Sequence, residues 1–319
     1  MVGPGQNWDD SQRVCGGAIP GMTGTPAFTL VELQPTAVPL LIAVPHAGRC
    51  YSGPLLERMR NPGFAALRLE DRYVDRLAEA VARRTGAALL VAHAPRAMID
   101  LNRAEDDVDW DMFPARGVVP EGPGCYTPGR RARSGLGLIP RRVPGLGELW
   151  KRRHDEEDLA HRIAGVHRPY HQCLAHTLAR LRARWGAALL LDLHSMPPLG
   201  SPGGHRGPEF VIGDRFGATC EGRLVGSSFA YFSSQGRSAA HNRPYAGGYV
   251  LERHADPASG VHALQLEIDR GSYLDSRLAE PGTGFAEIVD LLAGLIRSLA
   301  AEVAELGRPQ ADNWPAAAE

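Results

Sequence analysis

The sequence predicts an α/β protein in which helices cover both faces of a mostly parallel β-sheet within one domain. Two runs of residues, 37–44 (AVPLLIAV) and 187–191 (AALLL), are apolar throughout. Strands of this kind need cover on both faces, which is typical of central parallel strands. Segments with apolar side chains at helical spacing alternate with these runs, and that alternation favours the α/β class.

The other elements follow in chain order. We expect a helix over 67–84 (LRLEDRYVDRLAEAVARR), then Gly86 and a second buried strand over 87–92. A long charged helical region is predicted from about 148 to 185, with an interruption near Pro169. The remaining elements are short strands at 209–213, 248–251 and 262–268 and an amphipathic closing helix at 286–306.

Domain boundaries follow from where this periodicity begins and ends. Residues 1–27 lack it and are expected to form a tail or a loose wrap, residues 28–308 form the single domain, and residues 309–319 form a C-terminal tail. The segments 112–144 and 197–208 are rich in Gly, Pro and Arg. They are predicted to be long loops of the kind that is functional or mobile.

Composition narrows the class of protein further. The 35 Lys and Arg against 36 Asp and Glu give a net charge of -1, which argues against a dedicated nucleic-acid binder. No apolar stretch is long enough to cross a bilayer and the polar N-terminus does not resemble a signal peptide, so we expect no membrane partner and a cytoplasmic location. Five scattered cysteines without a C-x-x-C pair predict neither a disulfide framework nor a thiolate zinc site. The sequence leaves the oligomeric state open.

Polar residues that follow buried strands are the first candidates for a site, because ligands of open α/β sheets bind beyond the carboxyl ends of the strands. Such positions are held by His46, Arg96, His194 and Glu267. Two histidines and one carboxylate, with a position left for water, form the ligand set of many catalytic zinc sites. His46 and His194 are therefore candidate metal ligands, although either could be a core histidine bonded to a backbone carbonyl.

The third ligand is less easily assigned, since the position three residues after His46 is an arginine. Asp71 and Asp75 are four residues apart and would share one face of the predicted helix 67–84. We favour Asp71, with Glu70 or Asp75 as alternatives. The competing interpretation is that Asp71 only decorates a helix N-terminus.

Glu267 lies in an otherwise apolar strand (LQLEI), where an unpaired carboxylate would cost several kcal/mol. It could be paired with Arg253 or Arg270, or it could be a general base next to a metal-activated water. The segment 96–103 (RAMIDLNR) combines two guanidinium groups with an amide and suits a substrate that bears carboxylates. Alternatively, Arg96 and Arg103 pair with Asp100 and Asp106 on the surface. No G-x-S-x-G or Walker A motif offers a rival chemistry.

An ordered set of motifs leads to a specific resemblance. The motifs are PHAG at 45–48, DRYVDRL at 71–77, R-x-x-x-D-L-N-R at 96–103, RPYH at 168–171, DLHS at 192–195, NRPYAGGY at 242–249 and GVHALQLE at 260–267. In this order, from about residue 40 to 275, the chain resembles the N-formylglutamate amidohydrolase family. The resemblance implies a three-layer α/β/α sandwich with a mixed sheet, related to zinc carboxypeptidases and aspartoacylases, and one Zn²⁺ per chain.

The resemblance also implies roles for individual residues. His46, Asp71 and His194 match the metal ligands, Glu267 matches the general base, and Arg96 matches the arginine that polarises the scissile carbonyl. Asn102 and Arg103 match the pair that binds the substrate carboxylate, and Arg243 is a further candidate for that task. The family commonly carries F-K-G-G where this chain has Tyr245 to Gly248, and the missing lysine bears on the exact substrate.

These observations together predict a zinc-dependent hydrolase that cleaves the amide of an N-acyl amino acid. The resemblance favours N-formyl-L-glutamate, which would give formate and L-glutamate in histidine degradation. The alternatives are a related amidohydrolase or carboxypeptidase acting on another N-acyl amino acid or peptide, and a non-catalytic binding protein on the same fold.

Overall fold

A computed structural model describes residues 8, 11–114, 130–200 and 207–308 of the chain. Its centre is an eight-stranded sheet in the order β1-β2-β4-β3-β7-β10-β8-β9. The four central strands β4, β3, β7 and β10 run parallel to one another, whereas β1, β2 and β8 join by antiparallel pairing. The sheet is therefore mixed, with a parallel centre, as predicted.

The strands of this sheet are β1 (Gln12–Gly16), β2 (Phe28–Glu32), β3 (Leu40–Val44), β4 (Ala88–Ala92), β7 (Ala188–Met196), β8 (Phe210–Gly213), β9 (Ala239–His241) and β10 (Val261–Asp269). A separate two-stranded ribbon consists of β5 (Arg142–Val143) and β6 (Gly147–Glu148). The predicted buried strands are present, but β7 extends through Met196. Asp192 and His194 therefore lie within this strand, rather than beyond it.

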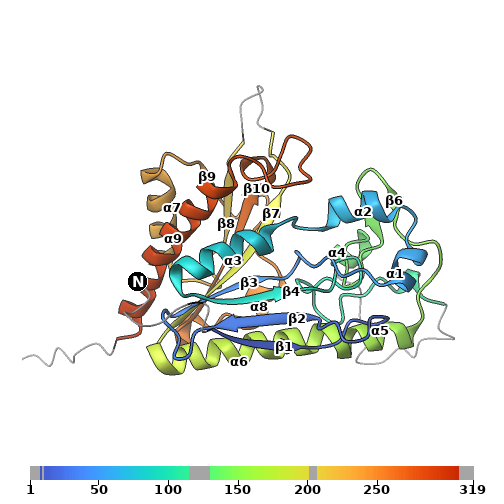
Figure 1. Cartoon of the computed structure of the whole chain (residues 1–319), viewed down its shortest axis with the longest axis horizontal. Helices are drawn as coiled ribbons and strands as arrows, with labels where there is room; N and C mark the ends of the chain where they lie inside the picture. Colours follow the sequence, from blue (N-terminus) through green and yellow to red (C-terminus); the bar gives the residue numbers. More distant parts are fainter. Residues whose placement is uncertain (1–7, 9–10, 115–129, 201–206, 309–319) are drawn as a thin grey trace, which may run out of the picture.

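Helices cover both faces of the sheet, as Figure 1 shows. One face carries α3 (Val74–Thr85), α7 (Gly222–Ser234) and α9 (Phe285–Leu306). The other carries α6 (Arg168–Trp185) and α8 (Tyr249–His254). The remaining helices are α1 (Gly53–Arg58), α2 (Pro62–Leu69), α4 (Arg130–Arg133) and α5 (Glu156–Arg162), with one π-helical turn at Ile163–His167 between α5 and α6. The result is the predicted three-layer α/β/α sandwich.

The pleat of β7 assigns its side chains to these two layers. Leu189, Leu191 and Leu193 pack in the core with α3 and α9, whereas Ala188 and Leu190 pack in the core with α6. Because successive side chains of a strand point to opposite faces, Asp192 and His194 lie on the α6 face. The same alternation puts Gln265 and Glu267 of β10 on that face, since Leu264, Leu266 and Ile268 lie in the α3 core.

Two local predictions were wrong. The segment 67–84 is not one helix: α2 ends at Leu69, and α3 begins at Val74 after Tyr73 in a left-handed conformation (φ 58°). Residues 248–251 open the helix α8 instead of forming a strand, because the side-chain oxygen of Asn102 accepts the backbone N–H of Val250 at 2.9 Å. The predicted interruption near Pro169 is present as the π-helical turn Ile163–His167, which ends just before α6, and Pro169 lies in the first turn of α6.

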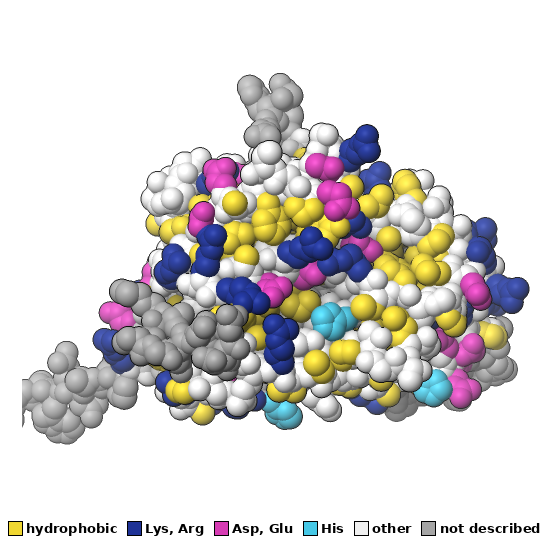
Figure 2. Space-filling model, viewed as in Figure 1, with side chains coloured by type: hydrophobic (Ala, Val, Ile, Leu, Met, Phe, Trp, Pro, Cys, Tyr) yellow, Lys and Arg dark blue, Asp and Glu magenta, His cyan; other side chains and the backbone are white. Residues whose placement is uncertain are grey.

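The N-terminal segment also differs from the expected tail or loose wrap, since β1 pairs with β2 over five residues. Only part of the two predicted long loops is described; residues 115–129 and 201–206 lie outside the described ranges, as does the predicted tail 309–319. Basic and acidic side chains are interspersed with apolar ones on the face that Figure 2 shows. Among the described helices, none has the length and apolar character that a bilayer-spanning segment needs.

Candidate active site

Strand register brings three of the predicted residues together. His46 follows β3 by two residues, and β3 pairs with β7, which carries His194. On the other side of β7, Glu267 of β10 is the direct parallel partner of His194. All three side chains are buried. The loop that carries His46 packs closely on the segment after β4, because a Cβ on Gly48 would lie 2.0 Å from the carbonyl oxygen of Ala94.

Asp71 reaches the same place from the break between α2 and α3. Its backbone N–H donates to the carbonyl of His46 at 2.9 Å, which ties this break to the loop after β3. Of the alternatives, Glu70 pairs with Arg72 at 3.0 Å and Asp75 pairs with Arg49 at 2.6 Å. Asp71 is thus the carboxylate that lies beside the two histidines.

His46, Asp71 and His194 form a compact cluster of possible ligand atoms, all within 4.8 Å of one another. The Oδ2 atom of Asp71 lies 3.0 Å from Nδ1 of His194 and 3.7 Å from Nδ1 of His46. Zinc bonds of about 2.0–2.1 Å in tetrahedral geometry separate neighbouring ligand atoms by about 3.3 Å. The two distances from Oδ2 of Asp71 are close to this value, so its position between the two imidazoles suits a shared ion.

A carboxylate supports each histidine from behind. His46 donates from Nε2 to Oδ1 of Asp100 at 2.7 Å, and His194 donates from Nε2 to Oδ2 of Asp192 at 2.9 Å. These contacts leave both Nδ1 atoms facing Asp71. Carboxylates that orient the second ring nitrogen are the usual support of metal-binding histidines, so the donor set and its surroundings fit a divalent metal.

Asp71 is itself oriented by Arg270 and Ser195. Its Oδ1 atom accepts hydrogen bonds from Nη2 of Arg270 at 3.3 Å and from Oγ of Ser195 at 3.4 Å. Arg270 also donates to the carbonyl of Glu70 at 2.6 Å and so satisfies the end of α2. With Oδ1 held in this way, Oδ2 is the oxygen directed at the histidines.

The electrostatics of the cluster favour a bound positive charge. Burial raises the pKa of Asp71, but hydrogen bonds and charges from His194 and His46 outweigh it and hold that pKa well below its ordinary value. Burial lowers the pKa of His194, but the charge and hydrogen bond of Asp192 and the hydrogen bond of Asp71 raise it well above its ordinary value. Both directions express the same attraction between the Asp71 carboxylate and positive charge on the histidine side of the cluster, which is the charge that a bound metal cation would supply.

Glu267 has the environment of a proton-transferring carboxylate. Its Oε1 atom accepts a hydrogen bond from Nε2 of Gln265 at 3.0 Å, and among the described residues no arginine or lysine forms a salt bridge with it. Arg270 is bound to Asp71 instead. Burial raises the pKa of Glu267 to about 7; the charge of His194 lowers it to a smaller extent, and the charge of Asp71 raises it further. A carboxylate of this kind can take and return a proton near neutral pH.

Arg96 is tied to the His46–Asp71–His194 cluster through Asp100. Its Nε and Nη2 atoms both lie 2.9 Å from Oδ2 of Asp100, the carboxylate that supports His46. The alternative interpretation placed an Arg96–Asp100 pair on the surface. The two residues do pair, but the Asp100 side chain is buried. Burial lowers the pKa of Arg96, but the charges of Asp100, Asp71 and Glu267 raise it overall.

Arg103 and Asn102 follow in the same turn. The Arg103 guanidinium donates to the carbonyl of Leu136 at 2.9 Å and to that of Asn102 at 2.7 Å, and it lies 4.0 Å from Asp100. The Asn102 side chain bridges α8 and β10: it accepts from Val250 and donates to Gln265 at 3.4 Å. Asn102 thus holds the walls of the site together.

The segment before α8 approaches the site, since a Cβ on Gly248 would lie 2.4 Å from Oδ1 of Asn102. Tyr245 is half-buried, and burial raises its pKa together with the nearby charge of Glu267, while Arg270 opposes this. Arg243 is exposed two residues earlier in this segment.

Two histidines that were not among the predicted site residues hold the turn 100–103. His167 donates from Nε2 to the carbonyl of Arg103 at 2.8 Å, and His171 donates from Nε2 to that of Leu101 at 3.0 Å. Both rings come from the α6 side and fix the backbone on either side of Asn102. Asp100, Asp192, Arg270 and Tyr245 were also missed, although DLHS and R-x-x-x-D-L-N-R contain the first two.

A buried two-histidine, one-aspartate cluster with a carboxylate of raised pKa beside it, at strand ends of an α/β/α sandwich, defines a metal-ready hydrolase site. The sequence profile of the N-formylglutamate amidohydrolase family matches residues 38–274. The chain belongs to this family, and it is an amidohydrolase.

Individual relatives agree with this assignment. N-formylglutamate deformylase of Pseudomonas aeruginosa is 30% identical over 284 residues, which is 85% of this chain and 94% of that protein. N-formylglutamate deformylase of Pseudomonas putida is 31% identical over 258 residues, covering 77% and 85% of the two chains. The crystal structure of N-formylglutamate amidohydrolase from Ralstonia eutropha JMP134 is similar with a TM-score of 0.76 and 33% identity over 88% of this chain and 98% of that chain.

Proposed function

We propose that this enzyme hydrolyses N-formyl-L-glutamate to formate and L-glutamate, a step of histidine degradation. The observation that carries the proposal is the direct pairing of Glu267 with His194 beside the His46–Asp71–His194 cluster. The relatives named N-formylglutamate deformylase support the choice of substrate.

The cluster would hold one zinc ion through Nδ1 of His46, Nδ1 of His194 and Oδ2 of Asp71. When bound, the ion supplies a Lewis acid that polarises the formyl carbonyl and favours ionisation of a water molecule. Asp100 and Asp192 keep the two imidazoles in the required tautomer and orientation.

Glu267 moves the proton. As a carboxylate it accepts a proton from the attacking water at one of its oxygens, while Gln265 fixes Oε1. It then returns that proton to the departing amide nitrogen, which leaves as the amine of L-glutamate. The raised pKa suits both transfers. With a pKa of about 7, the carboxylate is a stronger base than that of an ordinary glutamate, and the protonated carboxyl group can still donate its proton.

The arginines would bind the substrate. Arg96 uses Nε and Nη2 on Asp100, so its Nη1 is the atom to stabilise negative charge on the formyl oxygen. Arg103 and Arg243 would bind the carboxylates, and Asn102 would act with them by holding the turn against α8 and β10.

Metal content and turnover test this function together. The purified enzyme should carry about one divalent ion per chain by elemental analysis and should release formate from N-formyl-L-glutamate. His46→Ala and His194→Ala should each lose most of the metal and the activity. His241→Ala is a suitable control, because His241 also pairs with an aspartate, Asp214 at 3.0 Å, outside the cluster. Full metal loading of either ligand variant would contradict the assignment.

A panel of substrates separates this reaction from its relatives. N-formyl-L-glutamate should be hydrolysed with a higher kcat/KM than N-acetyl-L-glutamate, N-formyl-L-valine and a dipeptide. A preference for one of the other compounds would identify a different amide as the substrate while leaving the metal assignment intact.

A further inference from the structure

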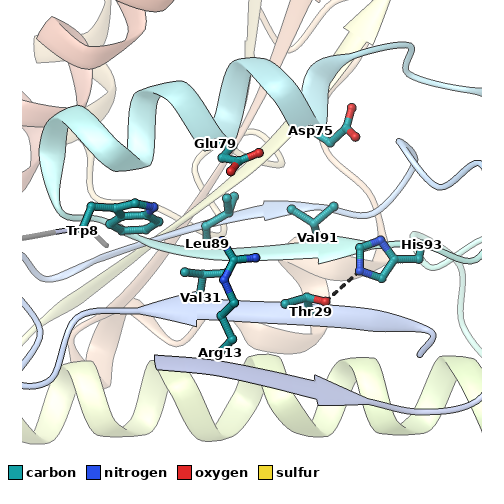
Figure 3. A pocket seen from close by; sticks show the side chains of 9 residues that line it. All are labelled: Trp8, Arg13, Thr29, Val31, Asp75, Glu79, Leu89, Val91 and His93. Atoms are coloured by element: carbon teal, nitrogen blue, oxygen red, sulfur yellow. Dashed lines mark hydrogen bonds between the residues drawn. The ribbon is translucent and has the colours of Figure 1, made fainter. Parts of the chain in front are cut away.

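A cavity lies between α3 and the strands β1, β2 and β4 (Figure 3). Its volume is about 150 Å³. Its walls are formed by Trp8, Arg13, Thr29, Val31, Asp75, Glu79, Leu89, Val91 and His93. Val31 and Leu89 belong to the core on the α3 face of the sheet, whereas His194 and Glu267 lie on the α6 face.

One wall of this cavity offers hydrogen-bond donors that have no partner. Trp8 is only 6% exposed, and its indole Nε1 makes no hydrogen bond within the part of the chain that the structure describes. Figure 3 shows this nitrogen on the edge of the ring that faces the other lining side chains. Burying an indole N–H without an acceptor is unfavourable, so the cavity calls for a ligand with an acceptor group.

Arg13 adds a positive charge to the same wall. Its side chain rises from β1 across β2 towards α3, and within the described ranges no carboxylate forms a salt bridge with it. A guanidinium can hold a carboxylate with two parallel hydrogen bonds. The indole N–H and Arg13 together are suited to a carboxylate.

The opposite wall is acidic. Glu79 extends from α3 towards the cavity, and its partner Arg83 lies at 3.1 Å in a solvent-exposed pair of the kind that contributes little. Asp75, one turn earlier, is held by Arg49 at 2.6 Å. Glu79 is therefore the carboxylate that can exchange its exposed partner for a ligand ammonium group.

The floor between these walls is apolar. It consists of Val31, Leu89 and Val91, whereas Thr29 and His93 are already bonded to each other at 2.7 Å. A dry cavity of about 150 Å³ holds a six-carbon ring in another protein, so a molecule with six to ten heavy atoms is of suitable size. An apolar floor between a cation and an anion fits a short aliphatic chain that carries both charges.

We infer that this cavity, which we name the α3 pocket (Trp8, Arg13, Val31, Glu79, Leu89 and Val91), binds a small α-amino acid as its zwitterion. The carboxylate lies against Arg13 and the Trp8 indole, the ammonium group lies against Glu79, and an aliphatic side chain covers the floor. The α3 pocket also borders the loop that carries His46, because the backbone N–H of Cys50 donates to the carbonyl of His93 at 3.0 Å.

Calorimetric titration of the intact protein with L-valine tests this inference without any use of turnover. Isovalerate and isobutylamine are matched probes, since each keeps the branched chain and only one of the two charges. L-valine should bind at least about tenfold more tightly than either. Equal affinity for isovalerate or isobutylamine would refute a zwitterion site, as would the absence of binding heat for L-valine.

Variants assign the heat to the α3 pocket. Arg13→Gln and Glu79→Gln should each weaken L-valine binding at least about tenfold, whereas Arg182→Gln, at an exposed position of α6, should not change it. Arg13→Gln should retain hydrolysis of N-formyl-L-glutamate, so a loss of valine binding is distinct from a failure of the proposed reaction. If binding instead survives Arg13→Gln and is lost in Glu267→Gln, the amino acid occupies the catalytic site and the inference is wrong.

Discussion

Replacing Asp192 by Asn tests whether the carboxylates behind the histidines maintain the metal site. Asp192 is fully buried, and its Oδ2 atom accepts the Nε2–H of His194 at 2.9 Å while Oδ1 has no hydrogen-bond partner. The negative charge of Asp192 raises the pKa of His194 and makes Nδ1 a better donor of electrons to a cation. Asn keeps the size of the side chain and one acceptor oxygen, but it removes this charge. Loss of such a support costs about 10- to 100-fold in metal affinity, which corresponds to about 1.4–2.7 kcal/mol.

Competition with a chelator of known affinity measures this change directly. Asp214→Asn is the matched control, because Asp214 accepts a hydrogen bond from Nε2 of His241 at 3.0 Å outside the cluster. The control should bind metal like the parent enzyme even if both variants unfold at a lower temperature. Unchanged metal affinity in Asp192→Asn, or an equal loss in both variants, would refute the reasoning.

The remaining predictions concern proton transfer, substrate recognition and pH. Glu267→Gln should keep the metal and the fold but lower kcat at least about 100-fold with little change in KM, as measured by steady-state kinetics; metal loss as large as in the histidine variants would instead indicate a structural role. Arg103→Lys should weaken kcat/KM for N-formyl-L-glutamate, and Arg103→Ala should weaken it by about 2–5 kcal/mol. N-formyl-L-glutamine should be affected much less if Arg103 binds the side-chain carboxylate and equally if it binds the α-carboxylate, whereas no effect on either compound would remove Arg103 from the site. Burial lowers the pKa of His154 to about 4, so the unfolded state binds the proton first and the free energy of unfolding should fall by about 2 kcal/mol between pH 7.5 and 5 through this residue. Urea unfolding at the two pH values should show that much less pH dependence in His154→Gln, and an unchanged dependence would contradict this origin.

Local patterns in the sequence were sufficient for the parallel centre of the sheet and for part of the site, but not for the outer strands β1, β2 and β9. The apolar runs around β3 and β7 identify buried strands because a strand covered on both faces has no polar positions to alternate. A polar residue that ends or interrupts such a run is conspicuous, and His46, His194 and Glu267 are found in this way. Because β10 pairs with β7 in the sheet, Glu267 lies beside His194.

The geometry of Asp71 could not be read from local periodicity. The segment 67–84 has helical spacing throughout, yet the helix is interrupted between α2 and α3. There Arg270, which is 200 positions away in the sequence, donates a hydrogen bond to the carbonyl of Glu70. That break turns Asp71 towards the histidines, whereas a continuous helix would have aligned it with Asp75. The strand expected at 248–251 failed for the same reason, since Asn102 supplies the cap of α8 from a distant turn.

The sequence by itself thus determined which residues are candidates for the site, because burial and polarity conflict at His46, His194 and Glu267. Only the tertiary structure decided how they are held. Asp100, Asp192, Arg270, His167 and His171 act through contacts with residues that are mostly far away along the chain, and the energy of each contact depends on distance and orientation in space. A periodic pattern records which face of an element is buried, but it holds no information about which side chain of another element arrives there.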